Sequence, residues 1–222
     1  TPSNSSAASD VYKRQTLTLI LALKVFGKRK VIPIYSDTGV EFPQSQEYID
    51  KISKILGIDY VRVKANIDRE LERRGYLPTQ DDRWCMLLKV KSIEEYIFEN
   101  FRDEKVLLVV GDRDVESETR ERKPYISVKE NVVKVTPIRM WATHHIQLYF
   151  MYNNIPFNPL YELGFYRIGC YICPFLRTWE IYIILRNKDI LSSLLKLRYF
   201  KDFIEAKKKG SPHPSVSTGT HD

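Results

Sequence analysis

From residue 16 onward, the hydrophobic positions fall into two alternating patterns. Short runs rich in Val, Ile and Tyr indicate buried strands, and longer segments with apolar residues three or four positions apart indicate helices. The predicted strands are 31–35, 60–63 and 106–110, and the predicted helices are 16–25, 43–56 and 84–101. Strands that alternate with helices predict the α/β class, here a three-layer parallel sheet with helices on both faces.

The pattern changes in the second half of the chain. Residues 127–135 alternate between apolar and polar positions and predict a hairpin or an edge strand. After residue 141 the chain is predicted to be helical, broken by a loop over 154–174, and 187–209 has the pattern of one basic amphipathic helix or two. A helical C-terminal part therefore follows the α/β part.

The two ends of the chain differ from the rest. Residues 1–9 are a Ser, Ala and Asn tract that is too polar to pack, and the tail 210–222 is predicted to be disordered. Residues 5–15, SSAASDVYKRQ, resemble the translation of an adapter used to prepare sequencing libraries. We therefore expect 1–15 to be a disordered or artefactual leader on a truncated gene. The expected division is the leader 1–15, one domain over 16–209 (α/β part 16–140, helical part 141–209) and the tail 210–222.

Length and hydropathy limit the class of protein. The 222 residues are 43% hydrophobic, which is enough for one domain with a substantial core. No apolar run approaches the ~18 residues that a membrane span needs, and no signal peptide with a cleavage site is recognisable. We therefore expect a cytoplasmic protein without a membrane partner.

The charge balance changes this picture in one respect. A net charge of +7 suits polyanionic partners, either nucleotides or nucleic acid. The alternative is a Lys- and Glu-rich surface without a special partner, as in heat-adapted proteins, and the many Ile, Tyr and Lys residues fit a thermophile.

The first candidate site follows the predicted strand 31–35. It contains Asp37, Thr38 and Gly39, at the carboxyl end of a strand, where open α/β sheets bind their ligands. The Asp37 carboxylate can accept hydrogen bonds from ribose or adenine donors, and Gly39 lets the backbone approach a ligand closely. The same residues also form ordinary tight turns, which is the alternative interpretation.

The second candidate site follows the predicted strand 106–110. Arg113 and Arg120 could form a fork for phosphate or sulfate, because a guanidinium group offers paired hydrogen bonds to such oxyanions. Glu116 could orient one of these arginines. The alternative is a solvated run of charges.

The third candidate site consists of the three cysteines. Cys170 and Cys173 stand in a Cys-x-x-Cys-Pro sequence, which is typical of a tight knuckle around a metal or a cluster, and Cys85 lies far upstream. Three cysteines cannot form a disulfide framework. A structural zinc or a redox dithiol would use the same pair, and two buried cysteines without a ligand remain a further alternative.

Four segments together resemble the phosphoadenosine phosphosulfate (PAPS) and adenosine phosphosulfate (APS) reductase family, in particular its archaeal members. They occur in the family's order, and the resemblance covers about 16–187. The segments are IPIYSDTGVEFP at 32–43, RWCMLLK at 83–89, GDRDVESETR at 111–120 and NPLYELGFYRIGCYICP at 158–174. The resemblance implies the Rossmann-related fold of the adenine nucleotide alpha-hydrolase-like superfamily, with its PP-loop ATP pyrophosphatases.

The resemblance also implies roles for the candidate residues. Asp37, Thr38 and Gly39 would line the adenosine side of an adenylyl sulfate nucleotide. Four residues would face its phosphosulfate side, namely Arg113, Glu116, Ser117 and Arg120. Cys85, Cys170 and Cys173 would hold a [4Fe–4S] cluster. The family often has two adjacent cysteines where this chain has Cys85 and Met86, so the fourth cluster ligand is open.

Two departures from the family pattern concern the ends of the similar region. The family's glycine-rich phosphate loop would stand just before Thr16, where this chain has DVYKRQ, and a nucleophilic cysteine would follow Cys173, where it has none. We therefore expect a fragment that binds adenine nucleotides poorly by itself, and no catalytic residue is assigned.

Three functions are compatible with the sequence. The first is a sulfonucleotide reductase-like enzyme of sulfur metabolism and sulfate assimilation, active in full-length form, with a thioredoxin-like protein as a candidate electron donor. The second is an ATP-pyrophosphatase-type sulfur transferase that acts on tRNA or DNA, with the basic segment 196–209 contacting the nucleic acid. The third is a non-catalytic module in which zinc connects the cysteines.

Overall fold

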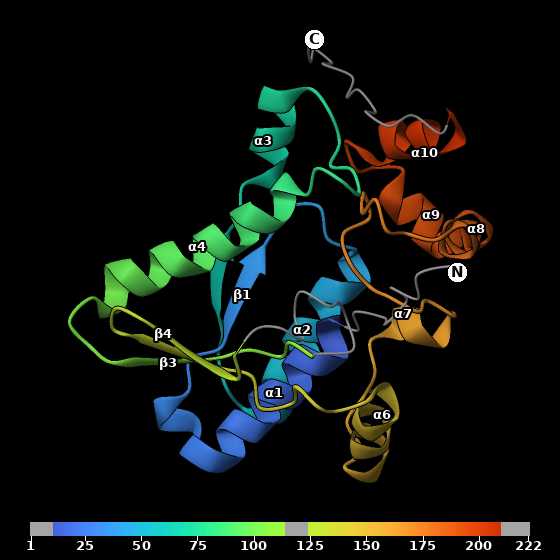
Figure 1. The fold of residues 1–222 in the computed structure, drawn as a ribbon. Coiled ribbons are helices and arrows are strands. Elements are labelled where there is room, and N and C mark those ends of the chain that lie inside the picture. Colours follow the sequence, from blue (N-terminus) through green and yellow to red (C-terminus); the bar gives the residue numbers. More distant parts are fainter. Residues whose placement is uncertain (1–10, 114–123, 210–222) are drawn as a thin grey trace, which may run out of the picture. The chain divides into compact units, whose positions relative to one another are not determined.

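The computed structural model describes residues 11–113 and 124–209, which alternate between helices and short strands in the first half and are mainly helical from residue 143 onward (Figure 1). The long helices and the first sheet are α1 (Val11–Phe26), β1 (Ile34–Asp37), α2 (Pro43–Leu56), β2 (Val61–Lys64), α3 (Ile67–Arg74) and α4 (Trp84–Phe101). A short 3-10 helix, Lys28–Lys30, follows α1. The remaining elements are β3 (Val106–Val109), β4 (Ile126–Lys129), β5 (Val132–Val135), α6 (Thr143–Tyr152), α7 (Pro159–Glu162), α8 (Thr178–Arg186), α9 (Lys188–Leu194) and α10 (Phe200–Lys209).

The strands form two sheets, both with parallel neighbours. β1 pairs with β2, and the N–H groups of Val61 and Ala65 donate to the carbonyls of Pro33 (2.8 Å) and Asp37 (2.7 Å), which gives both strands the same direction. The second sheet has the order β3-β5-β4, in which β3 and β5 are parallel. The predicted α/β class with parallel strands and helices is confirmed.

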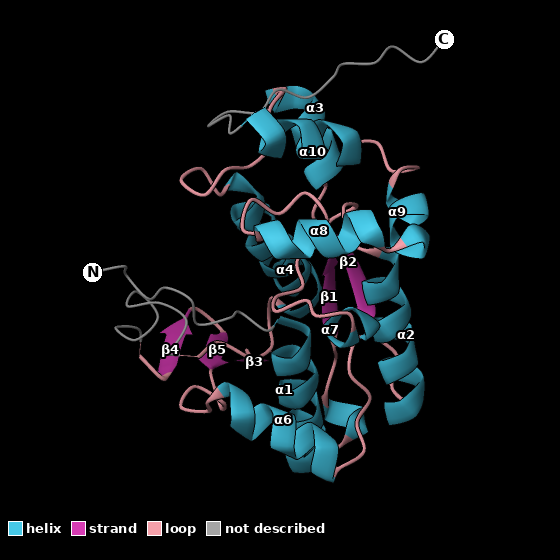
Figure 2. Ribbon diagram, turned by 90° about the vertical axis from the view of Figure 1, so that its right-hand side faces the viewer, coloured by secondary structure: helices cyan, strands magenta, loops and turns pink. Residues whose placement is uncertain are grey.

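The predicted hairpin at 127–135 is also present. β4 and β5 are antiparallel, with Ile126 opposite Val135 and Lys129 opposite Val132, and Figure 2 shows them side by side. The predicted helical C-terminal part appears as α6 to α10, and the basic segment 187–209 forms two helices, α9 and α10. Helix α3 is not predicted by the hydrophobic pattern, because its eight residues place only Ile67 and Leu71 in the core, and the four-residue helix α7 lies within the predicted loop 154–174.

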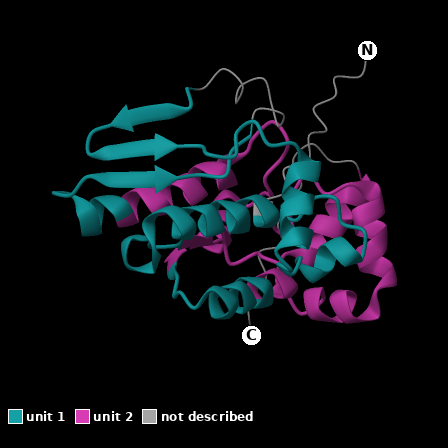
Figure 3. Cartoon of the chain, turned by 90° about the horizontal axis from the view of Figure 1, so that it is seen from below, with its two compact units in different colours: residues 1–33, 47–61, 97–168 teal, residues 34–46, 62–96, 169–222 magenta. Residues whose placement is uncertain are grey.

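The described chain divides into two compact units, coloured separately in Figure 3. Of the described residues, the first unit contains 11–33, 47–61, 97–113 and 124–168, and the second contains 34–46, 62–96 and 169–209. The chain therefore passes between the two units several times.

The core of the first unit is formed where α1 meets α6. Leu17 of α1 packs with Ile138, Ile146 and Phe150, all of which are fully buried. Burial of such side chains contributes about 1.5–3 kcal/mol each relative to an exposed position, so this cluster fixes α6 against α1.

Helix α1 begins at Val11, five residues before the predicted start of ordered structure. Tyr12, Lys13 and Arg14 are buried. The Lys13 ammonium lies 3.6 Å from the centroid of the Tyr161 ring, and Arg14 Nη1 donates to the Gly111 carbonyl at 2.6 Å. Residues 11–15, which the sequence analysis assigned to the leader, are thus helical, because their long side chains find aromatic and carbonyl partners within the first unit.

The core of the second unit is built around Tyr171. Its ring packs edge-on against Phe42 at 6.5 Å and against Phe200 at 6.3 Å between centroids. These three rings come from the segments after β1, before α8 and at the start of α10. The Cys-x-x-Cys sequence that contains Tyr171 is therefore anchored in a core rather than on a loose loop.

None of the helices among the described residues is long and apolar enough to cross a membrane.

The cluster between α1 and α6 predicts the effect of a single truncation. Phe150→Ala should lower the free energy of unfolding by about 3–5 kcal/mol, because it leaves a cavity in a fully buried position. Tyr152→Ala, two residues away on α6 and 88% exposed, should change it by less than about 0.5 kcal/mol. Urea denaturation followed by circular dichroism measures both, and equal effects of the two substitutions would contradict the assigned core.

Candidate metal and nucleotide site

The candidate nucleotide segment forms a closed turn at the end of β1. Asp37 Oδ1 accepts a hydrogen bond from the Gly39 N–H at 2.9 Å, and Oδ2 lies 3.5 Å from Arg62 Nη1. Gly39 has a φ of +73°, a conformation that residues with a Cβ rarely adopt. These contacts stabilise the turn. An ordinary tight turn is the alternative to ligand binding that the sequence offers for these residues.

Thr38 connects this turn to a buried charge. The Thr38 hydroxyl donates to Glu41 Oε1 at 2.9 Å and accepts from the Val40 N–H at 3.3 Å. Both Thr38 and Glu41 are buried. A buried carboxylate needs a positive partner, and Lys89 of α4 provides it, with 3.6 Å between Nζ and Oε1.

Lys89 in turn reaches the cysteines. Its ammonium group donates to Cys170 Sγ at 3.6 Å, so one lysine lies between the Glu41 carboxylate and a thiol. We call Thr38, Glu41, Lys89 and Cys170 the polar chain. It joins the turn after β1 to the Cys-x-x-Cys segment within the second unit.

The backbone fixes the Cys-x-x-Cys segment at the same place. Glu41 and Cys170 form an isolated antiparallel bridge, and the Tyr171 N–H donates to the Val40 carbonyl at 3.0 Å. The Cys173 N–H donates back to the Cys170 carbonyl at 3.0 Å, which closes a tight turn. The knuckle predicted from the spacing is therefore present, and its first cysteine is held beside Glu41.

The three cysteines lie in one unit and influence one another electrostatically. Cys85 stands in the first turn of α4, one turn before Lys89, and all three thiols are free. Burial raises the pKa of Cys170 to about 12, although the Lys89 ammonium lowers it, and burial likewise raises the pKa of Cys85. Burial disfavours the charge on Lys89, but Cys170 and Glu41 outweigh it and raise its pKa. Without a bound cation, the site therefore favours neutral thiols beside a charged lysine.

The donor set fits a thiophilic group. The Cys85 and Cys170 thiols, which burial keeps neutral, become good ligands when a metal supplies the positive charge that stabilises the thiolates. Among residues 11–113 and 124–209, no group of three or more Cys, His, Asp or Glu side chains is placed to hold a single metal ion. An iron–sulfur cluster offers several irons, so its thiolates do not have to converge on one point.

The other predicted residues are placed differently. Arg113 is buried in the first unit, and its Nη1 donates to the Trp141 carbonyl and to the Thr143 hydroxyl, both at 3.2 Å. Glu116, Ser117 and Arg120 lie outside the described residues. The structure thus connects Thr38 to Cys170 through Glu41 and Lys89, and it places Arg113 in the other unit.

The sequence analysis did not single out three functional side chains of this site. Glu41 and Lys89 lie inside the segments 32–43 and 83–89 that carry the family resemblance. A charged residue in an otherwise apolar run, such as Lys89 in WCMLLK, could have indicated a buried polar contact. Lys207 of α10 donates to the Pro174 carbonyl at 2.7 Å, directly after the knuckle. This lysine belongs to the basic segment that the sequence analysis proposed for nucleic-acid contact, and it also hydrogen-bonds the backbone beside the Cys-x-x-Cys loop.

Comparison with solved structures defines the class of the fold. The chain superposes on a PAPS reductase from Candida auris with a TM-score of 0.51 and 23% identity, covering 72% of this chain and 78% of that one. A Candida glabrata FMN adenylyltransferase gives a TM-score of 0.50 and 16% identity over 76% of this chain and 56% of that one. The chain therefore shares the α/β fold of these two proteins.

The family follows from the sequence match. Residues 8–176 match the phosphoadenosine phosphosulfate reductase domain, and the chain belongs to that family. Two uncharacterised proteins of the archaeon Methanocaldococcus jannaschii are each 34% identical to it, over 79% and 81% of this chain. An adenosine 5'-phosphosulfate reductase of Salinibacter ruber is 28% identical over 63% of this chain. The matches span 37%, 45% and 56% of these relatives, so the chain corresponds to about half of their length or less.

The position of Lys89 predicts how the thiols react in the metal-free, reduced protein. Lys89→Met should slow alkylation of Cys170 and Cys85 by iodoacetamide at pH 9, because loss of the ammonium raises both thiol pKa values further. At a pH below the thiol pKa, raising that pKa by one lowers the fraction of reactive thiolate about tenfold. Labelling is followed residue by residue by mass spectrometry.

Lys91→Met is the matched control for this prediction. Lys91 lies two residues further along α4, is exposed and pairs with Glu95 at 3.4 Å. It should leave both labelling rates unchanged, and a Lys89→Met variant that labels as fast as the unmodified protein would contradict the polar chain.

Proposed function

We propose that the chain forms the nucleotide- and cluster-binding part of a sulfonucleotide reductase-like enzyme. Its substrate is an adenylyl sulfate nucleotide, APS or PAPS, which is reduced to sulfite. Cys85, Cys170 and Cys173 hold a [4Fe–4S] cluster. The polar chain carries this proposal, because it connects the cysteines to the turn that follows β1.

The nucleotide side of the proposal rests on the position of the turn. Open α/β sheets bind ligands at the carboxyl ends of their strands, and Asp37, Thr38 and Gly39 follow β1 at such an end. We assign the adenosine moiety to this turn. Family membership and the named reductases among the relatives support the choice of nucleotide.

The cluster side rests on charge. When bound, the cluster would supply positive iron that stabilises the thiolates of Cys85, Cys170 and Cys173. Lys89 donates a hydrogen bond to Cys170 and offsets part of the thiolate charge. Glu41 keeps Lys89 protonated and in place, and Thr38 orients Glu41. Buried charges are tolerated only in such a paired, hydrogen-bonded arrangement.

The reduction itself requires a thiolate that attacks the sulfur of the nucleotide. The S–O bond to the adenylyl phosphate then breaks, the nucleotide leaves as the phosphate anion and the thiol becomes a thiosulfonate. Attack by a second thiol, from a thioredoxin-like donor, on the thiol's sulfur releases sulfite and leaves a disulfide. The three cysteines of this chain are assigned to the cluster, so the attacking thiol is not among them.

Metal analysis tests this proposal directly. After anaerobic reconstitution we expect iron and sulfide near four each per chain and a broad absorption band at ~400 nm. Cys85→Ala, Cys170→Ala and Cys173→Ala should each lower the iron content strongly. Met86→Ala should retain it, because Met86 adjoins Cys85 without being assigned as a ligand.

Two outcomes would sink the proposal. One equivalent of zinc without iron would turn the cysteines into a structural zinc site. A full-length gene product that binds neither iron nor adenylyl sulfate in calorimetry would remove both halves of the assignment.

The polar chain predicts how long the cluster survives in air. Glu41→Gln should shorten the lifetime of the ~400 nm absorption several-fold, because Lys89 loses its charged partner and Cys170 loses a fixed donor. Glu47→Gln changes an exposed carboxylate on α2 and serves as the control, with no expected effect. Equal decay rates for the two variants would show that Glu41 does not support the cluster.

A further inference from the structure

Helix α8 presents large aromatic side chains to solvent. Trp179 is 46% exposed and Tyr182 is 56% exposed, three residues apart and therefore on the same face of the helix. Leu185 adds apolar surface beside them at 43% exposure. The helix belongs to the second unit and is labelled in Figure 2. Aromatic side chains of this size are normally buried, so two on one helical face indicate a contact surface.

Each of the two rings is paired with an arginine. The Arg177 guanidinium lies 4.7 Å from the centroid of the Trp179 ring, and that of Arg186 lies 4.9 Å from the Tyr182 ring. Stacking on the ring holds a guanidinium group in place. Along the sequence the two rings thus lie between two arginines, Arg177 at the N-cap and Arg186 in the last turn of α8.

This face carries no negative charge from its own helix. The single acidic residue of α8, Glu180, is fully buried and accepts a hydrogen bond from the Arg177 N–H at 2.9 Å. The neighbouring sequence adds the exposed Lys188 and Asp189 at the start of α9, which cancel each other. Arg186, in the last turn of α8, therefore gives the face a positive charge, in a chain whose net charge is +7.

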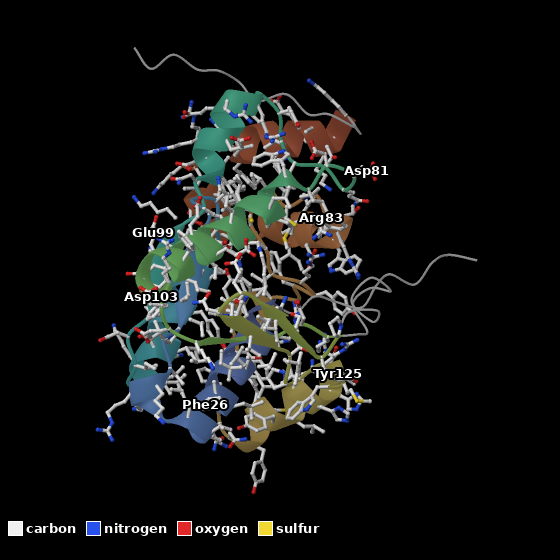
Figure 4. All side chains as sticks on the ribbon, turned by 60° about the vertical axis from the view of Figure 1, so that its left-hand side comes forward. Phe26, Asp81, Arg83, Glu99, Asp103 and Tyr125 are labelled. Carbon is white, nitrogen blue, oxygen red and sulfur yellow. The ribbon has the colours of Figure 1, made fainter. Side chains whose placement is uncertain are left out.

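The pattern continues into the segment before α8. Arg83, labelled in Figure 4, has its guanidinium 4.9 Å from the centroid of the Phe175 ring. Phe175 lies two residues after Cys173 and two before Arg177. Asp81, also labelled in Figure 4, is an exposed acid two residues before Arg83 and offsets the charge of that arginine. We therefore restrict the positive face to α8.

We propose that this face binds a single-stranded nucleic acid. Bases stack on Trp179 and Tyr182, and a phosphate pairs with Arg186. Single strands offer unstacked bases with flat faces next to a chain of phosphates, which are the two features that aromatic rings beside an arginine recognise. An acidic peptide supplies negative charge but no flat faces, and a duplex keeps its base faces covered.

The proposal is independent of the reductase assignment. It needs neither a cluster nor a nucleotide, and it uses none of the residues of the polar chain. Phe175 and α8 directly follow the Cys-x-x-Cys segment in the sequence. The residues proposed to bind the nucleic acid are therefore close in sequence to two of the proposed cluster ligands.

Fluorescence anisotropy with a labelled twelve-nucleotide oligouridylate tests the proposal on the full chain. Trp179→Ala and Tyr182→Ala should each weaken binding by about 5- to 150-fold, which corresponds to the loss of one stacked base. Trp179→Phe should restore most of the affinity, because it keeps a ring. Arg186→Gln should weaken binding and reduce the slope of log affinity against log salt by about 0.7.

Tyr152→Ala is the matched control, since Tyr152 is also an exposed aromatic residue but lies on α6 of the first unit. It should leave the affinity unchanged. Absence of binding at low salt would overturn the proposal, as would equal affinities of the Trp179→Ala variant and the unmodified chain. Binding of polyglutamate or of duplex RNA as tight as that of the oligouridylate would also overturn it, and would point to a protein partner or to general attraction of polyanions.

Discussion

The candidate site depends on one lysine held between a carboxylate and a thiol. Lys89 lies 3.6 Å from Glu41 Oε1 and 3.6 Å from Cys170 Sγ. A buried carboxylate, a buried thiol and a lysine would each be unfavourable alone, and they become tolerable as a group because each satisfies another. The backbone bridge between Glu41 and Cys170 keeps the group together. This arrangement couples the turn after β1 to the Cys-x-x-Cys segment, although more than a hundred residues separate them in the chain.

The sequence was sufficient to predict the elements whose patterns are local. The helices α2 and α4, the hairpin of β4 and β5, and the helical C-terminal part follow from periodicity, and the family followed from four ordered motifs. The start of α1 was not predictable in this way, because Lys13 and Arg14 look like surface residues until Tyr161 and Gly111 are placed beside them. Helix α3 escaped for a similar reason, since its sequence is mostly charged.

The candidate site was predictable in its residues but not in its connections. Spacing alone indicated the Cys-x-x-Cys knuckle and the turn around Asp37, yet nothing in the sequence pairs Glu41 with Lys89, because that contact depends on the packing of α4 against the turn. The same holds for Lys207, which a helical plot places among surface cations and which contacts the Pro174 carbonyl. Pairings of this kind arise from tertiary structure, whereas motifs report only which side chains are available.

The most direct test of the central assignment is a Mössbauer spectrum of the protein reconstituted anaerobically with ⁵⁷Fe. Three thiolates on a four-iron cluster leave one iron with a different ligand, so we predict a spectrum in which one iron of the cluster is distinct from the other three. Adenylyl sulfate added to the full-length gene product should shift that spectrum. Absence of bound iron, or iron present only as isolated ions, would contradict the assignment of Cys85, Cys170 and Cys173 as cluster ligands.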